Sequence, residues 1–262
     1  MKKKKHTFAI CAYKESQFLE QCVKSIVPQR KYSDIIMTTS TPNDWIDSLA
    51  KKYEIPLFVR NGKSQIQDDW NFACDNAKTE WVTVAHQDDV YDLMYSRRLL
   101  DEINKRPNAI MAFCDYHPIK HGHIGTDLNS RMKRFFHFPL RFEAMSTSKF
   151  WKKYSLAFGN SISCPSVAYH KSLIQGEIFT SDLNFALDWD TFVKFAQYDA
   201  PFIYIPEYLF YYRIHSGATS AEYTKENVRQ SEEMYMFRKF WPEWLIKLGF
   251  RLYQKSYDTY KD

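Results

Sequence analysis

The sequence predicts an α/β fold with a mostly parallel central sheet. Short apolar runs rich in β-branched residues alternate with amphipathic stretches through residues 7–116, which is the rhythm of βαβ units. The chain has 262 residues, 45% of them hydrophobic, enough for one large domain or two small ones with a buried core. Gly and Pro are scarce, at 7 and 10 residues, which excludes collagen-like and low-complexity classes.

Each element of the first half has a local signal. Phe18, Cys22 and Ile26 recur at helical spacing after Ser16, so a helix with Ser16 as its N-cap is expected from residue 16 to 26. Runs of apolar residues bounded by turn residues predict strands. These rules place strands at 7–11, 34–40, 55–61, 80–85 and 109–116, and further helices at 44–52, 66–77 and 95–105.

The second half differs in composition from the first. Residues 117–158 are basic, aromatic and irregular, so a long loop is expected before a helix at 143–154, and loops of that length often act as lids or acceptor sites. The chain shows no repeat and no flexible linker, so the two halves are expected to share one core. The other expected elements are a strand at 162–170, a helix at 188–198, two strands at 201–214 interrupted at Pro206, and helices at 223–259 broken near Pro242.

Charge and cysteine content exclude several classes of protein. The net charge of +5 comes from 36 basic and 31 acidic residues and is concentrated at Lys2–Lys5 and 238–262, which argues against a nucleic-acid binder. The five cysteines show no CxxC spacing, which argues against a disulfide framework or a zinc site and favours the cytoplasm. No apolar run approaches the roughly 18 residues that cross a bilayer.

Two adjacent carboxylates follow the strand expected at 80–85. The sequence there reads His86-Gln87-Asp88-Asp89, and carboxylates so close repel each other unless a cation or a hydrogen-bond donor compensates. A hard divalent ion, Mg²⁺ or Mn²⁺, would bind such oxygens together with phosphate and water. The alternative is that the pair only caps the helix that follows.

A series of short motifs supports the metal interpretation over the cap. They are Ala12-Tyr13-Lys14-Glu15, Thr39-Ser40-Thr41, Asp69-Trp70-Asn71, His86-Gln87-Asp88-Asp89, Gly159-Asn160 with the stretch to Tyr169, Asp188-Trp189-Asp190 and Tyr212-Arg213-Ile214-His215-Ser216-Gly217. In order and spacing they resemble the motifs of family 2 glycosyltransferases with the GT-A fold, which build bacterial surface polysaccharides. Each motif alone is weak, but the series over residues 7–220 is specific.

The resemblance implies a GT-A Rossmann-like fold and a nucleotide-sugar site. It divides the chain into a glycosyltransferase domain at 1–220, with a nucleotide-binding half (1–116) and an acceptor half (117–220), and a helical extension at 221–262. Asp89 and His215 would hold the divalent metal, Mn²⁺ or Mg²⁺. The residues that would contact the donor nucleotide or sugar are Ala12, Tyr13, Glu15, Ser40, Asp69, Gln87, Asp88 and Arg213.

Several of these residues also have a purely structural interpretation. Tyr13 could pack, Glu15 could open the first helix, and Arg213 could pair with Glu207 instead of phosphate. A lone His such as His215 is more often a packed or surface residue than a ligand. Where the family usually has an Asp soon after its second-loop Ser, this chain has Pro42 and Asn43, so the identity of the base stays open.

By the same resemblance, Asp188 would be the catalytic base. An inverting transfer needs a carboxylate that takes the proton of the acceptor hydroxyl as this attacks the anomeric carbon. Asp190 lies about 200° further round the helix, so only one of the two can face the cleft. The family's Glu before this Asp is Leu187 here, so Asp188 would act without that neighbour.

The expected function is therefore cytoplasmic sugar transfer from a nucleotide diphosphate, with a UDP-sugar favoured, to a glycan or lipid-linked acceptor. The C-terminal helices mix Trp, Phe and Leu with basic residues, which is typical of a helix at an anionic membrane surface, although packing on the domain fits equally well. The alternatives are a nucleotidyltransferase, which would show a Gly-rich phosphate loop near the N-terminus, and a non-catalytic nucleotide- or sugar-binding domain.

Overall fold

The computed structural model describes residues 3–125, 128–215, 217 and 228–254. In chain order the strands are β1 (His6–Ala12), β2 (Asp34–Thr39), β3 (Leu57–Val59), β4 (Trp81–His86), β5 (Val90–Tyr91), β6 (Met111–Lys120), β7 (His123–Ile124), β8 (Ala168–His170) and β9 (Phe202–Ile214). The α-helices are α1 (Leu19–Ile26), α2 (Asp44–Lys52), α3 (Ile66–Asn76), α4 (Tyr95–Lys105), α5 (Leu128–His137), α6 (Glu143–Thr147), α7 (Lys149–Leu156), α8 (Leu187–Phe195), α10 (Val228–Phe237) and α11 (Glu243–Gln254). Short 3-10 helices lie at Val27–Gln29, Phe138–Arg141 (η2), Cys164–Ser166 and Lys171–Leu173.

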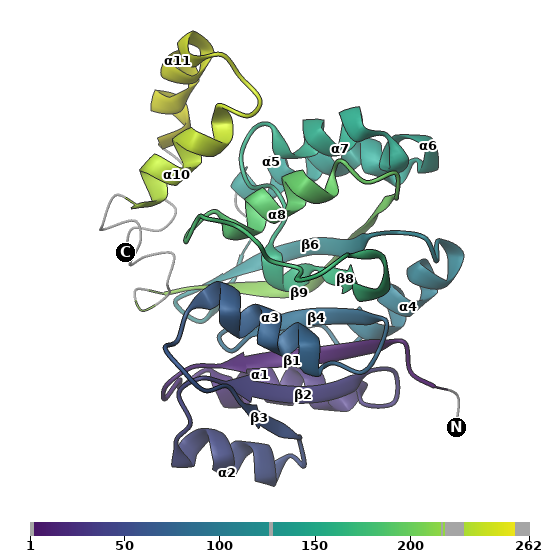
Figure 1. Cartoon of the computed structure of the whole chain (residues 1–262), viewed down its shortest axis with the longest axis vertical. Coiled ribbons are helices and arrows are strands. Elements are labelled where there is room, and N and C mark those ends of the chain that lie inside the picture. Colours follow the sequence, from purple (N-terminus) through teal and green to yellow (C-terminus); the bar gives the residue numbers. More distant parts are fainter. Residues whose placement is uncertain (1–2, 126–127, 216, 218–227, 255–262) are drawn as a thin grey trace.

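One mostly parallel sheet forms the centre of the molecule (Figure 1). Its strand order is β3-β2-β1-β4-β8-β6-β9-β5, with β7 added beside β6. The run β3-β2-β1-β4 is parallel, and so is the pair β6 and β9, whereas β8 is antiparallel to both β4 and β6. The expected fold class is confirmed, with an inserted antiparallel strand joining two parallel blocks.

Alternation along the strands divides the core between the two faces of the sheet. On β1, Phe8 and Ile10 point to the face covered by α1, α2 and α4, while Ala9 points to the face covered by α3, α7 and α8, because successive side chains of a strand face opposite ways. Each cluster combines both halves of the chain: Phe8 lies in one with Phe210, and Ala9 in the other with Phe192.

The expected elements of the first half agree with the structure within a few residues, but the first helix starts later. It begins at Leu19 rather than residue 16, and its N-cap position is Phe18, without a side-chain cap. The hydroxyl of Ser16 instead accepts the backbone N–H of Phe18. Glu15 therefore lies in the preceding loop and does not open the helix, contrary to one of the sequence interpretations.

The second half is more ordered than the sequence predicts. Residues 117–158 hold the end of β6, β7, α5, η2 and two short helices, α6 and α7, that are separated at Ser148. The strand expected at 162–170 is shorter and consists of β8 alone, because Cys164–Ser166, which includes Pro165, forms a 3-10 helix before it. The two strands expected around Pro206 are one bulged strand, β9: the register jumps from Cys114↔Ile205 to Asp115↔Tyr208, which leaves Pro206 out of the pairing.

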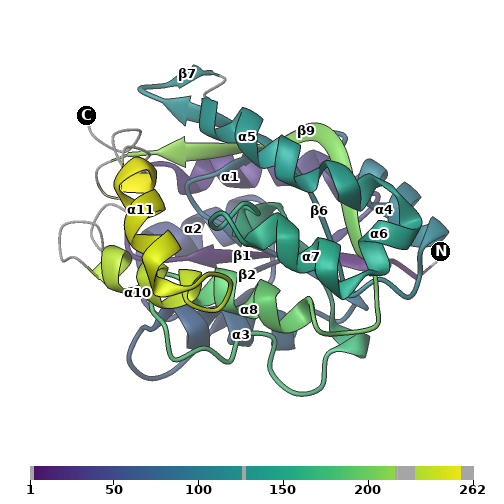
Figure 2. The same ribbon diagram turned by 90° about the horizontal axis from the view of Figure 1, so that it is seen from above.

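The C-terminal helices α10 and α11 lie at the opposite end of the molecule from α2 (Figure 1), beside α8 (Figure 2). The break at Pro242 is confirmed, since α11 begins at Glu243. Residues 223–227 and 255–259, also expected to be helical, lie outside the described residues, as does the expected boundary at 220/221. The division at 116/117 falls inside β6 and stays a prediction. In the part of the chain that the structure describes, no helix has the length and apolar character needed to span a bilayer.

Candidate functional site

A large cleft opens beyond the carboxyl ends of the parallel strands. Its volume is about 1440 Å³. One wall comes from the residues that follow β1, β2 and β4, because the carboxyl ends of parallel strands meet at one edge of the sheet. The opposite wall comes from α5, the loop before β8, the start of α8 and the C-terminal helices. Of the expected site residues, Ala12, Tyr13, Ser40, Asp69, Gln87, Asp88, Asp188 and His215 line it.

Asp89 is the most buried carboxylate of the site, with an exposed fraction of 1%. Its Oδ1 accepts the backbone N–H of Arg213 at 2.8 Å, while its Oδ2 has no hydrogen-bond partner among the described residues. Burial, followed by the charge of Asp88, raises the pKa of Asp89 well above its usual range. A buried carboxylate with one oxygen unused is costly by itself, and a cation placed there would compensate it.

Asp88 is held from the other side by a histidine. His215 Nε2 lies 3.0 Å from Asp88 Oδ2. Burial acts to raise the pKa of Asp88, but the hydrogen bond from His215 and the nearby imidazoles of His86 and His215 outweigh it and hold this pKa below its usual value. The pKa values of the two adjacent carboxyls therefore shift in opposite directions. Asp88 stays ionised, and Asp89 is hard to ionise without a cation.

His86 completes a group that could bind a metal ion. One ligand atom each from His86, Asp88 and Asp89 lie within 4.8 Å of one another. His86 stacks on Trp70, with ring centroids 4.9 Å apart, and its Nε2 has no hydrogen-bond partner in the described residues. Burial lowers the pKa of His86, so the imidazole is neutral and can donate a lone pair. The donor set, one imidazole and two carboxylates, fits a divalent ion such as Mn²⁺.

Arg213 supports this group from behind. Its Nε donates to the backbone carbonyl of Asp88 at 2.8 Å and its NH2 group to Gln21 Oε1 at 2.7 Å, and its guanidinium lies over the ring of Phe18. The pairing with Glu207 that the sequence left open is wrong, because Glu207 pairs with Arg98. Contact between Arg213 and phosphate stays a prediction.

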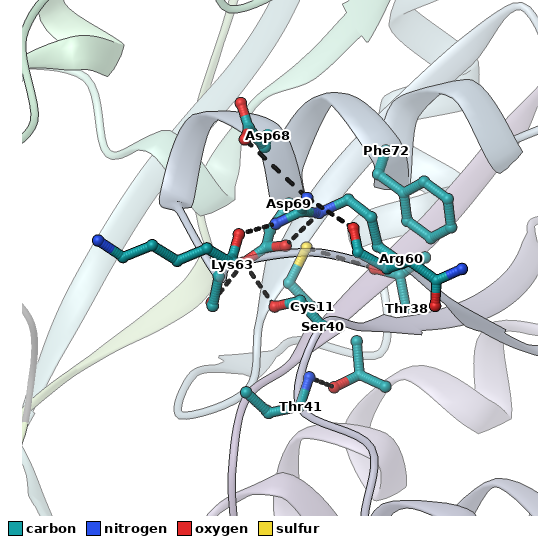
Figure 3. Close-up of polar contacts among 12 residues, drawn as sticks. Cys11, Thr38, Ser40, Thr41, Arg60, Lys63, Asp68, Asp69 and Phe72 are labelled. Carbon is teal, nitrogen blue, oxygen red and sulfur yellow. Dashed lines mark hydrogen bonds and ion pairs between the residues drawn. The ribbon is translucent and has the colours of Figure 1, made fainter.

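The far end of the cleft is fixed by hydrogen bonds between loops. The side-chain oxygen of Gln87 accepts the backbone N–H of Tyr13 at 2.9 Å, and its NH2 group donates to the backbone carbonyl of Tyr13 at 3.1 Å. Asp69 Oδ2 accepts the hydroxyls of Ser40 and Ser64 at 2.9 and 2.8 Å, and its Oδ1 accepts Arg60 Nε at 2.8 Å (Figure 3).

This ion-paired cluster connects the loops after β2 and β3 to the first turn of α3. Tyr13 is 44% exposed, so its ring has a free face on which an aromatic group could stack. Glu15 is exposed and is not among the described residues that line the cleft.

Asp188 lies in the first turn of α8, facing the cleft. Its Oδ2 accepts Asn160 Nδ2 at 2.8 Å and its Oδ1 accepts the N–H of Trp189 at 2.7 Å. Burial raises the pKa of Asp188 to about 6 despite these two bonds. Asp190, as helical geometry predicts, points away and pairs with Lys194 and Lys239. Asp188 is thus a carboxylate that ionises close to neutral pH, which suits a proton acceptor.

The start of α8 is held by a residue that the sequence analysis did not single out. The carboxylate of Glu232, on α10, accepts the backbone N–H groups of Asn184, Phe185 and Ala186 at 3.0, 2.8 and 2.9 Å. Two of these donors lie in the loop just before α8 and the third is that of its N-cap residue, Ala186, so Glu232 fixes the approach to that helix from a distant element. Nothing in the local sequence signals this contact, because 46 residues separate Glu232 from Ala186.

The C-terminal helices therefore form part of the cleft. Phe237 meets Trp189 of α8 edge to face, at 5.2 Å, and Phe240 stacks on the same ring at 6.3 Å. Trp241 and Ile246 line the cleft itself. Of the two interpretations of these helices, packing on the domain is present in the structure.

Comparison with known proteins agrees with this architecture. The family model described as glycosyl transferase family 2 matches residues 7–163, more than half of the chain. A comparison with curated proteins finds no match.

Three solved structures share the fold at low sequence identity. The fragment 1–349 of TarS of S. aureus is 14% identical, with a TM-score of 0.55, and the match covers 80% of this chain and 60% of that fragment. A mannosyltransferase of Pyrobaculum calidifontis, in complex with GDP-Man and Mn²⁺, is 16% identical with a TM-score of 0.60, covering 91% and 64%.

Glucosyl-3-phosphoglycerate synthase of Mycobacterium tuberculosis, in complex with Mn²⁺ and UDP-glucose, is 12% identical with a TM-score of 0.56, covering 87% and 77%. The match with this chain therefore spans less than two thirds of the TarS and mannosyltransferase chains. The family match, the sheet topology and the motifs gathered around one cleft lead to the same conclusion: the chain belongs to glycosyl transferase family 2.

Proposed function

We propose that the protein transfers one sugar, with inversion, from a nucleotide diphosphate to a growing bacterial surface glycan. The observation that carries the proposal is the cleft itself, which is lined by Asp188 as well as by His86 and Asp88, while the buried Asp89 lies beside the last two. TarS has also been solved with UDP-GlcNAc, and together with the donors bound to the other two relatives this supports a sugar nucleotide as donor. A UDP-sugar is our first choice.

In this mechanism the acidic group at the end of β4 would hold a divalent ion. Asp89 Oδ2, an oxygen of Asp88 and a nitrogen of His86 would be its ligands, and the ion would supply positive charge to offset the charge that develops on the departing diphosphate. His215 either joins the ligands or keeps Asp88 oriented through its 3.0 Å contact. Arg213 fixes the loop by binding the carbonyl of Asp88.

Asp188 acts on the acceptor. Its ionised carboxylate accepts the proton of the attacking hydroxyl, whose oxygen forms the new bond to the anomeric carbon. The bond from that carbon to the diphosphate oxygen breaks on the opposite face, and its electron pair leaves with the nucleotide. A pKa of about 6 keeps Asp188 ionised at neutral pH while leaving it basic enough to take the proton. Asn160 and the N–H of Trp189 orient the two oxygens.

The nucleoside would lie between the loops after β1 and β2. Tyr13 offers a ring face, and Ser40 and Asp69 offer polar edges that Arg60 holds in place. Gln87 ties the loop after β4 to the backbone of Tyr13, so nucleoside and diphosphate binding are mechanically linked. The acceptor would enter between α5 and α11, both of which contribute cleft-lining residues.

The proposed sugar transfer to a surface glycan also leads to a proposed cellular location. We assign it to the cytoplasm, peripheral on the inner face of the plasma membrane, with an acceptor carried on lipid. On α11, Trp244 and Leu248 are 67% and 71% exposed and lie one helical turn apart, so they could insert into a bilayer interface.

Calorimetric titration tests the donor site. UDP, GDP and dTDP are titrated with and without Mn²⁺ into wild type, Asp89→Asn and Asp188→Asn. The proposal expects Mn²⁺-dependent binding of one nucleotide, lost in Asp89→Asn and kept in Asp188→Asn, whereas transfer is lost in both. Binding of none of the three would overturn it. Nucleotide binding without sugar transfer would instead indicate a non-catalytic binding domain, and reaction with a nucleoside triphosphate would indicate a nucleotidyltransferase.

A further inference from the structure

A second surface, next to the cleft, has the composition of a membrane-binding site. It consists of Arg131, Arg134 and Phe135 on α5, Phe138 and Arg141 on η2, and Phe142, and we call it the arginine–phenylalanine patch. Phe135, Phe138 and Phe142 are 69%, 51% and 51% exposed. Three neighbouring phenylalanines this exposed are unusual, because monomeric soluble proteins rarely leave contiguous apolar area uncovered.

Phe138 is in contact with two other members of the patch. The rings of Phe138 and Phe142 meet edge to face at 5.7 Å, and the Arg141 guanidinium lies 5.7 Å from the centre of the Phe138 ring. A hollow of about 390 Å³ lies between Arg134, Phe135, Phe138 and Arg141. The two arginines at this hollow offer forked donors to a phosphate. The phenylalanines beside them offer apolar surface to acyl chains.

Arg134 is held in place from below the patch. Its Nε lies 3.1 Å from Oδ2 of Asp115, and its guanidinium lies over the ring of Tyr208 at 4.8 Å. Tyr204 donates to the same carboxylate at 2.9 Å and also lines the hollow. The buried Asp115 therefore fixes one cation of the patch, so less side-chain freedom is lost when a ligand binds.

Charge points to an anionic partner. Residues 128–153, which contain α5, η2, α6 and most of α7, hold seven basic residues and one acidic residue. This segment therefore carries a local excess of positive charge, as the two ends of the chain at Lys2–Lys5 and 238–262 also do. Arg131 and Arg141 are exposed. A uniformly anionic surface complements such a segment.

We propose that the arginine–phenylalanine patch docks the protein on an anionic lipid bilayer, with the phenylalanines in the interface and the arginines on lipid phosphates. A second copy of the chain fits less well, because a two-fold contact through this patch would bring Arg131 and Arg141 against their own counterparts. This surface is separate from the α11 stripe of Trp244 and Leu248.

Docking here would bring the bilayer next to the acceptor entrance. Helix α5 separates the two surfaces: Met132, Lys133 and Phe136 line the cleft, while Arg134 and Phe135 line the hollow. Figure 2 shows α5 along one edge of the molecule. A glycan attached to a lipid would then reach the cleft across one helix. Only this link to a lipid-carried acceptor rests on the proposed function.

Vesicle flotation tests the docking surface with the full chain. Vesicles of phosphatidylcholine alone and of phosphatidylcholine with phosphatidylglycerol are compared for wild type, Phe135→Ser/Phe138→Ser and Arg131→Ala/Arg141→Ala. We expect binding only to the anionic vesicles. Each exposed basic residue contributes roughly fivefold in affinity, so loss of two arginines should weaken binding about 25-fold, and loss of two phenylalanines at least about tenfold.

Two controls separate this surface from other exposed apolar residues. Leu93→Ser removes a side chain that is 59% exposed and belongs to neither α5 nor η2, and this variant should bind as wild type does. Trp244→Ser/Leu248→Ser removes the α11 stripe. If that variant loses all vesicle binding while Phe135→Ser/Phe138→Ser keeps it, α11 is the membrane site and the inference is wrong.

Nucleotide titration and light scattering complete the experiment. Unchanged UDP binding by the patch variants would show that the cleft is intact. Failure of wild type to bind any nucleotide would refute the proposed function, but the vesicle experiment would still test the docking surface. If wild type is a dimer and the Phe135→Ser/Phe138→Ser variant is a monomer, the patch binds a second copy and the inference is wrong. Equal binding to neutral and anionic vesicles would also overturn the inference.

Discussion

Replacing Asp188 with Asn should make the protein more stable while abolishing transfer. The reason is the cost of keeping an ionised carboxylate where burial disfavours its charge. Burial raises the pKa of Asp188 from 3.8 to about 6, so the folded state binds this proton more tightly than the unfolded state does. The folded protein is therefore penalised when Asp188 is ionised.

The size of the penalty follows from the shift in pKa. A shift of about two units corresponds to about 3 kcal/mol at 1.36 kcal/mol per unit. The penalty is absent below the unfolded pKa of 3.8, grows as pH rises, and is complete above the folded pKa of about 6. For a protein of this size, about 3 kcal/mol corresponds to a rise in Tm of roughly 6–12 °C.

The new amide can keep both hydrogen bonds of the carboxylate. Its oxygen can accept the N–H of Trp189, as Asp188 Oδ1 does now. Its NH2 group would face the Asn160 amide, whose Oδ1 has no partner among the described residues. A rotation of the Asn160 amide by half a turn presents that oxygen as an acceptor. The Asn160 NH2 group then takes the place that Oδ1 occupies without a partner, so the number of unsatisfied polar groups stays the same.

Thermal unfolding at about pH 7.5 and about pH 4.5 measures the effect. Asp188→Asn should exceed wild type at the higher pH and approach it at the lower, while transfer falls by a factor of about 100 or more. Asp190→Asn is the matched control: ion pairs with Lys194 and Lys239 outweigh burial and lower the pKa of Asp190, so this variant should lose stability at pH 7.5. A Tm for Asp188→Asn no higher than wild type at pH 7.5 would refute the reasoning.

Three further predictions follow from the same contacts. The kcat/KM of wild type should fall about tenfold per pH unit below about 6, because protonated Asp188 accepts no proton; a flat profile from pH 5 to 8 would contradict this assignment. Glu232→Gln should lower kcat several-fold and the free energy of unfolding by about 2 kcal/mol, since bonds to a carboxylate contribute about 1.5–3 kcal/mol, with UDP binding unchanged in calorimetry; equal loss of UDP binding would count against a local role at α8. Mn²⁺ should raise the Tm of wild type but not of Asp89→Asn, and equal gains in a metal titration would place the ion elsewhere.

The sequence by itself determined the fold class and the order of the motifs. Strands and helices of the first half could be predicted because their signals are local: alternation on a strand and a repeat near 3.6 on a helix depend on neighbours in the chain. Asp88 and Asp89 could be assigned to the end of β4 for the same reason. The second half was harder, because α5 exposes the apolar Met132 and Phe135 beside Arg131 and Arg134, a composition that suggests an irregular segment as readily as a helix.

Only the tertiary structure decided which distant residues meet. Arg213 lies 124 residues from Asp89 and binds it through the backbone, and Glu232 reaches the N-terminus of α8 from another helix. The insertion of β8 between β4 and β6 and the bulge that skips Pro206 likewise leave no local pattern. Such contacts depend on how whole layers pack against one another, since their energy is gained only when residues remote in the chain are buried together.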